Sequence, residues 1–142
     1  MLWLFQPPHI FLLRGDLVLL LRRSNTGLED GQLSVVAGHV EPGESVTAAA
    51  IREAREEVGI DLAAADLRVV GVMHRRSSEE RIDFFLACDL DAREPHNAEP
   101  TKCSELLWSP VADLPSDTIP YVRAALSNFR EGRWFEEFGW SD

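Results

Sequence analysis

The chain has little cysteine, and its two cysteines fall in no pattern associated with a bound metal or a redox pair. Cys88 and Cys103 lie outside any CxxC or Cys/His spacing. A chain of 142 residues can bury enough surface to fold without a disulfide. We therefore expect both cysteines to be small buried hydrophobic residues of a protein in a reducing, cytoplasmic environment.

Long apolar runs are also absent. No segment approaches the roughly 18 apolar residues of a membrane-spanning helix, so no membrane association is expected. The apolar beginning, residues 1–16, lacks a basic start and is interrupted by Pro7 and Pro8, which argues against a secretion signal. Hydrophobic residues make up 45% of the chain and charged residues 27%, as in ordinary folded proteins, and the length fits a single domain over residues 1–142.

Positive charge is scarce. The formal net charge is −10, with 14 Lys and Arg against 24 Asp and Glu. Non-specific binding to nucleic acid depends on clustered basic side chains that displace counterions from phosphates, so this class of function is not expected. An anionic substrate would need a metal ion between itself and so acidic a protein.

The hydrophobic pattern predicts an α/β fold. In chain order we expect a β-hairpin at 9–23, a loop at 24–32, a strand at 33–38, a helix at 46–58, strands at 67–74 and 81–90 joined by a charged loop at 75–80, a polar stretch at 91–102, a short strand at 104–108 and a helix at 120–131. Ser45 as N-cap and Gly59 as a left-handed C-terminal residue define the first helix. This order predicts one mixed sheet between helices.

The first predicted helix carries an acidic face. At 100° per residue, Glu53, Glu56 and Glu57 lie together, with β-carbons roughly 5–6 Å apart. Like charges at this spacing repel one another, and Arg52 is the local group that relieves them. An acidic helix can simply face solvent. Mg²⁺, however, prefers carboxylate and carbonyl oxygens and bridges them to substrate phosphates, so the face also predicts a magnesium site.

The spacing of the whole segment favours the metal site. Residues 38–60 satisfy the pattern Gly-x5-Glu-x7-Arg-Glu-U-x-Glu-Glu-x-Gly-U, where U is apolar. Seven fixed residues, each drawn at roughly 5–8%, match by chance in on the order of one chain in a million. The pattern is the Nudix box, and the chain resembles the Nudix hydrolases, in particular the MutT-like nucleoside triphosphate pyrophosphohydrolases.

The resemblance implies a fold, an activity and a set of partners. Nudix hydrolases are α/β/α sandwiches with a central mixed β-sheet, which agrees with the predicted order of elements. They hydrolyse a nucleoside diphosphate linked to another group, with Mg²⁺ or Mn²⁺. We therefore expect a pyrophosphohydrolase that binds a small nucleotide and exists as a monomer or homodimer.

The resemblance also assigns roles within the box. The metal ligands that it implies are the carbonyl oxygen of Gly38 and the carboxylates of Glu53, Glu56 and Glu57. The arginine matching Arg52 orients a box glutamate, and the glutamate matching Glu44 holds the preceding loop onto the helix.

A carboxylate must also orient or deprotonate the attacking water. Family members use either a box glutamate, often the one matching Glu53, or an acidic residue of a loop outside the box. The loop candidates here are Glu99 and Glu105, of which we favour Glu99. Each could instead be an ordinary solvated charge.

Substrate contacts are expected outside the metal ligands. The segment 98–115 resembles its counterpart in MutT-like enzymes, in which the loop leading into the last helix lies beside the bound base. This makes Asp117 and Tyr121 candidates for contact with the base, although a tyrosine on an amphipathic helix is more often part of the core. Arg23 is a candidate for a phosphate contact. His39, which stands where some members carry lysine, is a further candidate.

The leading prediction is Mg²⁺-dependent hydrolysis of a nucleoside triphosphate, oxidised or otherwise modified in some members, to a nucleoside monophosphate and pyrophosphate. Nucleotide sugars, ADP-ribose, dinucleoside polyphosphates and capped RNA are alternative substrates. A non-catalytic nucleotide-sensing Nudix module is the alternative from another functional class. The aromatic tail at 133–140 is expected to cover the core, with a self-interface as the alternative.

Overall fold

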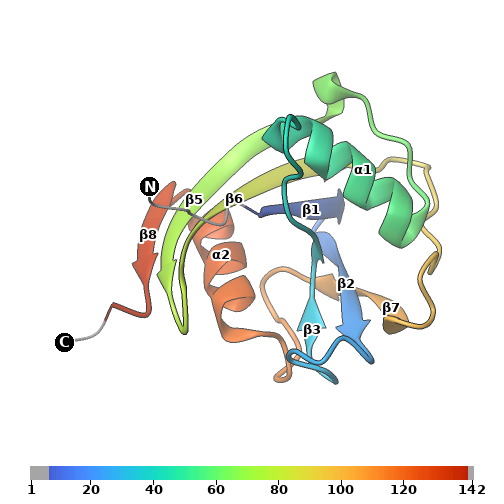
Figure 1. Cartoon of the computed structure of the whole chain (residues 1–142). Helices are drawn as coiled ribbons and strands as arrows, with labels where there is room; N and C mark the ends of the chain where they lie inside the picture. Colours follow the sequence, from blue (N-terminus) through green and yellow to red (C-terminus); the bar gives the residue numbers. More distant parts are fainter. Residues whose placement is uncertain (1–6, 141–142) are drawn as a thin grey trace.

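Apolar runs form the strands and the acidic segment forms a helix, in the predicted order (Figure 1). The computed structural model describes residues 7–140. Its elements are β1 (Pro8–Arg14), β2 (Leu17–Arg23), β3 (Leu33–Ser34), β4 (Val36–Ala37), α1 (Val46–Val58), the 3-10 helix η1 (Ala64–Asp66), β5 (Arg68–Arg76), β6 (Glu80–Asp89), β7 (Cys103–Pro110), α2 (Pro120–Glu131) and β8 (Phe135–Phe138). No helix in this part of the chain is long and apolar enough to span a membrane.

The strands form a mixed sheet in which β1 is central. The strand order is β3-β2-β1-β6-β5-β8, with β4 paired to β1 and β7 paired to β2. The pairs β1–β6 and β5–β8 are parallel, and the remaining pairs are antiparallel. Because β4 pairs with β1, His9 lies opposite Ala37, directly before the first glycine of the box.

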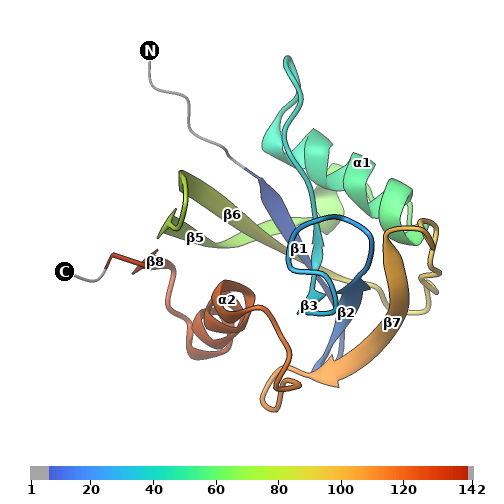
Figure 2. The same ribbon diagram turned by 60° about the horizontal axis from the view of Figure 1, so that its bottom comes forward.

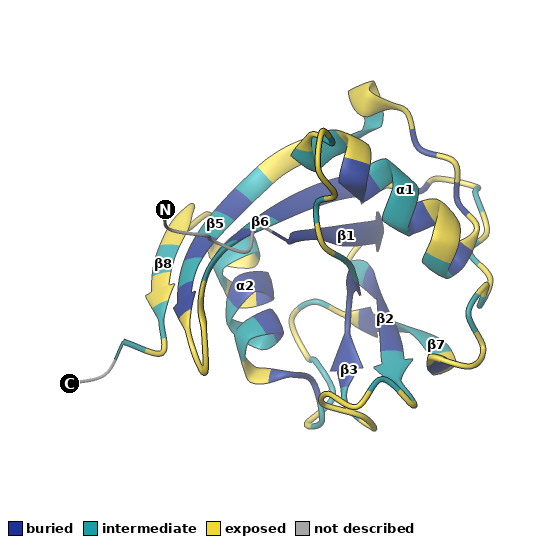
Figure 3. Ribbon diagram, in the orientation of Figure 1, coloured by how far each residue is buried: buried dark blue, intermediate teal, exposed yellow. Residues whose placement is uncertain are grey.

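Side chains alternate between the two faces of each strand, and this divides the core into two layers. In β1, Ile10 belongs to the layer under α1, and Phe11 belongs to the layer under α2. The helices contribute Ala50, Ala54 and Val58 from α1, and Val122, Ala125 and Leu126 from α2. Figure 2 shows the two helices on opposite sides of the strands, and Figure 3 marks buried residues on both helices and on the strands between them. The predicted α/β/α sandwich is therefore confirmed.

Both long helices have the predicted bounds, but several strands are longer than predicted. Backbone pairing between β5 and β6 continues through Arg76 and Glu80, so the predicted loop at 75–80 shrinks to residues 77–79. Charged side chains suggested a loop there, yet such side chains can face solvent while the backbone keeps pairing. Likewise, β7 extends to Pro110 because it pairs with β2 over the full length of that strand.

The strand predicted at 33–38 is instead two short strands separated by Val35. β3 pairs with β2, whereas β4 pairs with β1, so the chain changes partner at this point. After β4, the amide of Gly38 donates to the carbonyl of Pro8 at 3.4 Å, so the turn before α1 starts beside the first residue of β1.

The aromatic tail forms a strand that the sequence did not predict. β8 pairs in parallel with β5 at the edge of the sheet. Phe138 packs against the layer under α2, but Trp134 and Phe135 remain 58% and 49% exposed. The expectation that the tail covers the core therefore holds for Phe138 and is wrong for the two exposed aromatic residues.

Candidate functional site

A cleft of about 650 Å³ opens beside the turn that precedes α1. Its walls come from β1, the end of β2, the loop after it, the turn before α1, α1 itself, the 99–103 segment and the first turn of α2. This volume lies within the range of small-molecule sites. Its lining includes the carboxylates of Glu53, Glu56 and Glu57 with Glu99, the aromatic pair His9 and Tyr121, and several basic side chains.

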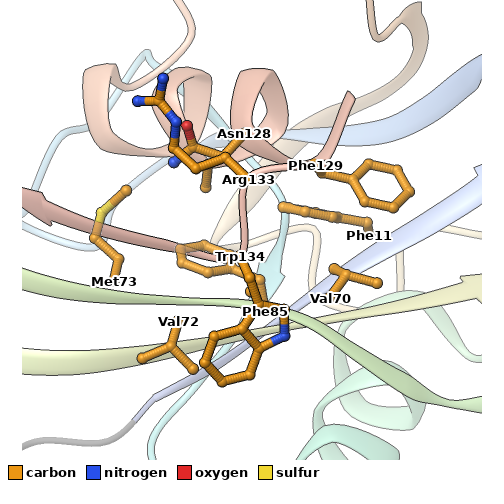
Figure 4. Close-up of a pocket in the computed structure, with 11 residues that line it drawn as sticks. Phe11, Val70, Val72, Met73, Phe85, Asn128, Phe129, Arg133 and Trp134 are labelled. Carbon is orange, nitrogen blue, oxygen red and sulfur yellow. The ribbon is translucent and has the colours of Figure 1, made fainter. Parts of the chain in front are cut away.

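A second hollow lies between α2 and β5 and is not a ligand site. Figure 4 shows Phe11, Met73 and Phe85 among the side chains that surround it. Its volume is about 10 Å³, which is about enough for one water molecule. It is a packing gap in the α2 layer, so the large cleft is the candidate functional site.

The ends of α1 are fixed by the residues that the sequence predicts as caps. The Ser45 hydroxyl accepts a hydrogen bond from the amide of Ala48 at 3.0 Å. Gly59 has a φ of 67°, and its amide donates to the last turn of the helix. A side chain at position 59 would also collide with His96, because a β-carbon there would lie 1.9 Å from the imidazole Cε1.

Gly38 provides space for a box glutamate. A β-carbon at this position would lie 2.1 Å from both Cδ and Oε1 of Glu53. The φ of Gly38 is outside the left-handed region, so the backbone itself does not require glycine here. The missing side chain allows the Glu53 carboxyl group, whose side chain is 12% exposed, to lie directly against the turn.

Arg52 connects the turn to the acidic face. Its guanidinium donates to both oxygens of Glu44 at 2.8 and 2.9 Å and to the carbonyl of His39 at 2.9 Å. It also donates to Glu53 at 2.6 Å and to Glu56 at 3.3 Å. The hydrogen bonds from Arg52 lower the pKa of Glu44 to about 2. One cation therefore holds the turn, the helix and two box glutamates in a fixed arrangement.

Glu57 carries a buried oxygen that has no donor. Its Oε2 atom lacks a hydrogen-bond partner within residues 7–140. Burial raises the pKa of Glu57 well above its ordinary value, and a hydrogen bond to Glu53 and the charges of Glu53 and Glu99 raise it further. An unpaired buried carboxylate oxygen is unfavourable, and a cation beside it would supply the missing partner.

The two loop carboxylates lie in different places. Glu99 lines the cleft, and its charge acts on Glu57. The amide of Ala98 donates to the carbonyl of Glu57 at 3.1 Å, which holds this segment against α1. Glu105 pairs with Arg22 at 2.6 Å and is not among the residues that line the cleft. The structure thus brings Glu99, and not Glu105, to the box.

Asp117 also lies outside the cleft lining. Its carboxylate accepts from Arg22 at 2.5 Å, and the same guanidinium nitrogen donates to the carbonyl of Gly31 at 2.7 Å. Asp117 therefore ties the loop before α2 to the loop after β2. Tyr121, in contrast, lines the cleft, and contact with the base stays a prediction for both residues.

Arg23 and His39 line the cleft, but each also has a role in holding a loop. The Arg23 guanidinium donates to the Leu28 carbonyl at 2.9 Å and to the Thr26 hydroxyl at 3.1 Å. The carbonyl of His39 accepts from Arg52. Arg23 must rearrange these bonds to bind a phosphate with its full set of donors.

Lys102 is a cleft residue that sequence reasoning missed. It is the only lysine of the chain, and its ammonium makes no ion pair or hydrogen bond with other residues of the 7–140 segment. Its backbone is fixed, since its amide donates to the Glu99 carbonyl and its carbonyl accepts from the Ser24 amide, both at 2.9 Å. Lys102 is thus a cation available to an anionic ligand. Only its nearness to Glu99 in sequence could have indicated this.

His9 is the second cleft residue that the sequence did not single out. It is 1% exposed and bonds to the Tyr121 hydroxyl at 3.1 Å through Nε2. The available signal was weak, because it consists of one polar residue directly before the apolar run of β1. A lone histidine in such a strand is usually a satisfied core residue.

The carboxylate group fits a hard divalent cation, although it is not preassembled. Among the described residues, no three His, Cys, Asp or Glu side chains converge into a complete metal site. Burial and the neighbouring Glu53 and Glu99 raise the pKa of Glu57 well above its ordinary value. The unpartnered Glu57 oxygen and the all-oxygen donor set match what Mg²⁺ and Mn²⁺ prefer. A cation bound there would supply the partner that the buried Glu57 oxygen lacks among the described residues.

Comparison with curated proteins identifies two informative relatives. The "NAD-capped RNA hydrolase NudC" of Stutzerimonas stutzeri is 47% identical over 53 residues, which cover 37% of this chain and 18% of NudC. The match therefore spans less than a fifth of NudC. The "Putative 8-oxo-dGTP diphosphatase" of Bacillus subtilis is 28% identical over 123 residues, covering 87% of this chain and 77% of that protein.

The structural comparison and the family model cover most of the chain. The crystal structure of a MutT NUDIX hydrolase from Burkholderia pseudomallei superimposes with a TM-score of 0.79 and 25% identity, covering 89% of this chain and 98% of the other. The family model described as the NUDIX domain matches residues 8–129. These residues contain strands β1 to β7, α1 and nearly all of α2, so the chain belongs to the Nudix hydrolase family.

Proposed function

We propose that this Nudix hydrolase converts a nucleoside triphosphate to the nucleoside monophosphate and pyrophosphate, with Mg²⁺ or Mn²⁺ as cofactor. The observation that carries the proposal is the buried, unpartnered Glu57 oxygen within a cleft that also offers the unpaired ammonium of Lys102. A cation between carboxylates and phosphates, together with a second positive group for the remaining phosphate charge, suits a polyanionic substrate. The B. subtilis relative, matched over most of both chains, is described as acting on a nucleoside triphosphate.

The residues that would hold the metal are Glu53, Glu56 and Glu57, with the carbonyl of Gly38. When bound, the metal would neutralise charge on the phosphate oxygens and on the leaving group. Arg52 keeps Glu53 and Glu56 oriented through its bonds at 2.6 and 3.3 Å. These bonds restrict the positions that the two carboxylates can take before a metal ion binds.

Glu99 is the carboxylate that we assign to the attacking water. Water adds to phosphorus, the bond to the leaving pyrophosphate breaks, and the proton of the water passes to Glu99. One carboxylate oxygen of Glu53 already accepts a hydrogen bond from the Arg52 guanidinium at 2.6 Å, so this oxygen is engaged with Arg52. Glu99 lines the cleft and has no ion pair with the residues that the structure describes. General base catalysis of this type contributes roughly 10²–10⁴-fold.

A dinucleotide substrate is the second candidate. The local identity of 47% to NudC, which is described as a hydrolase of NAD-capped RNA, favours a substrate with a nucleotide on each side of the diphosphate. The non-catalytic module is disfavoured, because the box glutamates are retained and lie around one cleft.

The test is a panel of nucleoside triphosphates, oxidised triphosphates, nucleotide sugars, ADP-ribose and dinucleoside polyphosphates, assayed with Mg²⁺ and Mn²⁺ and with the products identified. We expect the highest kcat/KM for a triphosphate and pyrophosphate as a product. In Glu99→Gln we expect kcat to fall by roughly 10²-fold or more. Glu105→Gln is the matched control, because Glu105 lies outside the cleft lining. A nucleotide sugar or NAD as the best substrate would replace the triphosphate assignment.

A further inference from the structure

A buried charged network lies beside the cleft and has no part in the metal chemistry. Arg75 and Asp83 are 8% and 0% exposed, and they pair through two hydrogen bonds of 2.7 and 3.3 Å. The Arg75 guanidinium lies over the ring of Tyr121, 3.6 Å from its centroid. His9 meets the same ring edge-on, with centroids 5.5 Å apart. Tyr121 is therefore held from two sides by residues of β1 and β5.

Stability alone is a weak explanation for this network. Removing both charges from water costs about as much free energy as their attraction returns, so a buried ion pair is often no better than an apolar pair of similar size. A cation against the face of a tyrosine ring does, however, fix the ring in one position. The network is thus suited to holding the Tyr121 hydroxyl at a defined place in the cleft.

The direction of the hydrogen bond between His9 and Tyr121 follows from the contact between His9 and the backbone of Pro7. His9 Nδ1 lies 3.3 Å from the carbonyl oxygen of Pro7. A carbonyl can only accept, so Nδ1 carries the hydrogen. Burial lowers the pKa of His9 to about 4, which keeps the imidazole neutral at pH 7. Nε2 is then an acceptor, and the Tyr121 hydroxyl must donate to it across the 3.1 Å contact.

A hydroxyl whose only proton is already donated can offer a further ligand only its lone pairs. The lining of the cleft also includes apolar side chains, among them Val35 and Leu21. The Tyr121 ring and such apolar side chains suit the planar ring of a nucleobase. The Tyr121 hydroxyl oxygen would then distinguish a nucleobase that carries a hydrogen-bond donor from one that does not.

We propose that the Tyr121 oxygen accepts a hydrogen bond from an exocyclic amino group of the substrate's base, and that His9 is the positioning residue that makes Tyr121 an acceptor. This deepens the proposed function and rests on it, because it requires a nucleotide in the cleft. The enzyme prefers amino-bearing bases over otherwise identical bases that lack the amino group.

The experiment compares two matched pairs of substrates that differ by one amino group. One pair is adenosine triphosphate and purine riboside triphosphate, and the other pair is guanosine triphosphate and inosine triphosphate. For the wild-type enzyme we expect kcat/KM to favour the amino member of at least one pair by about 3- to 10-fold, as one neutral hydrogen bond allows. In Tyr121→Phe, which keeps the ring, this ratio should fall to about one.

His9→Phe tests the positioning role separately. Without the imidazole acceptor, the Tyr121 hydroxyl regains a proton to donate, so the preference for the amino group should disappear while the tyrosine remains. A purely structural role for His9 would lower kcat for all four substrates and leave the ratio unchanged. If the variant does not fold, ¹⁵N chemical shifts of His9 in the wild-type protein still decide the tautomer, and a hydrogen on Nε2 would overturn the inference.

The outcomes separate this inference from the proposed function. Failure to hydrolyse any nucleotide in the panel overturns the proposed function, and calorimetric binding of the same four nucleotides then tests the amino preference directly. Hydrolysis with equal kcat/KM within both pairs, or a preference that persists in Tyr121→Phe, overturns the inference and leaves the hydrolase intact.

Discussion

Replacement of Gly38 by alanine separates the geometry of the site from the stability of the fold. A β-carbon there would lie 2.1 Å from the Glu53 carboxyl, which must therefore move by about 1.3 Å to reach the 3.4 Å of an ordinary contact. The obstacle is the end of a flexible side chain, and the φ of Gly38 suits any residue. The chain can therefore accommodate alanine by turning Glu53 away from the turn and lengthening its bond to Arg52.

The expected result for Gly38→Ala is a large loss of turnover with little loss of stability. A displacement of about 1 Å at a catalytic group can reduce the rate by roughly 10²-fold. We expect kcat to fall to this extent, while the free energy of unfolding in urea changes by less than about 1 kcal/mol. The assay is kcat with Mg²⁺ on the best substrate of the panel, beside urea unfolding.

Gly71→Ala is the matched control for this variant. A β-carbon at position 71 would meet the Trp134 carbonyl at 3.5 Å, an ordinary contact, and the site lies away from the cleft. It should keep full turnover. Wild-type kcat in Gly38→Ala would refute the role assigned to the glycine, and so would unfolding of that variant at 25 °C, because the site would then be essential to the fold itself.

Three other perturbations address the cleft cation and the buried network. Lys102→Gln should raise KM for a triphosphate by about tenfold with a smaller change in kcat, because a charge-assisted phosphate contact is lost. Steady-state kinetics measure this change, and an unchanged KM would show that Lys102 does not contact the substrate. Asp83→Ala leaves the Arg75 charge buried without its partner and should lower the free energy of unfolding by about 3 kcal/mol or more, measured in urea at pH 7; a loss under 1 kcal/mol would contradict the burial of the pair. The pKa of His9 is lowered from 6.5 to about 4 by burial, so its contribution to stability is complete above pH 6.5 and is lost as the pH falls towards 4; the loss is up to about 3 kcal/mol at 1.36 kcal/mol per pH unit. Urea unfolding between pH 7 and 4 should therefore show a steeper decline in the wild-type protein than in His9→Phe, and equal slopes would contradict a neutral buried histidine.

The sequence predicts those parts of the site whose residues are neighbours on one helix. Glu53, Glu56 and Glu57 share a face because of the helical repeat alone, and the caps at Ser45 and Gly59 are local signals. The helix bounds therefore follow from the sequence, as does the position of Arg52 beside the glutamates. These inferences need no knowledge of how the helix packs.

Residues that reach the cleft from elsewhere could not be sorted in the same way. Glu99 and Glu105 are both acidic residues before or within a strand, and only the pairing of β7 with β2 places Glu105 beside Arg22. Asp117 lies just before α2 and Tyr121 lies in its first turn, so the sequence makes both equal candidates for the cleft. In the structure the Asp117 carboxylate accepts a hydrogen bond from the Arg22 guanidinium instead of lining the cleft. These outcomes depend on tertiary contacts that no local pattern encodes.

The tail shows the same limit for secondary structure. Phe135–Phe138 reads as two aromatic residues around two glutamates, a composition that is compatible with strand, helix or loop. Its strand conformation follows from the free edge of β5, which offers unpaired backbone groups to a nearby segment. The sequence contains no local signal for that edge.

The single lysine has a practical consequence for studying the molecule. Apart from the chain's own amino terminus, the ammonium of Lys102 is the only primary amine, and it lines the cleft. An amine-directed fluorophore, or a nucleotide whose ribose has been oxidised to a dialdehyde, would therefore attach at one side chain of the cleft. Labelling would be blocked by whatever ligand occupies the cleft, so the natural substrate could be sought by protection of one residue before any activity has been measured.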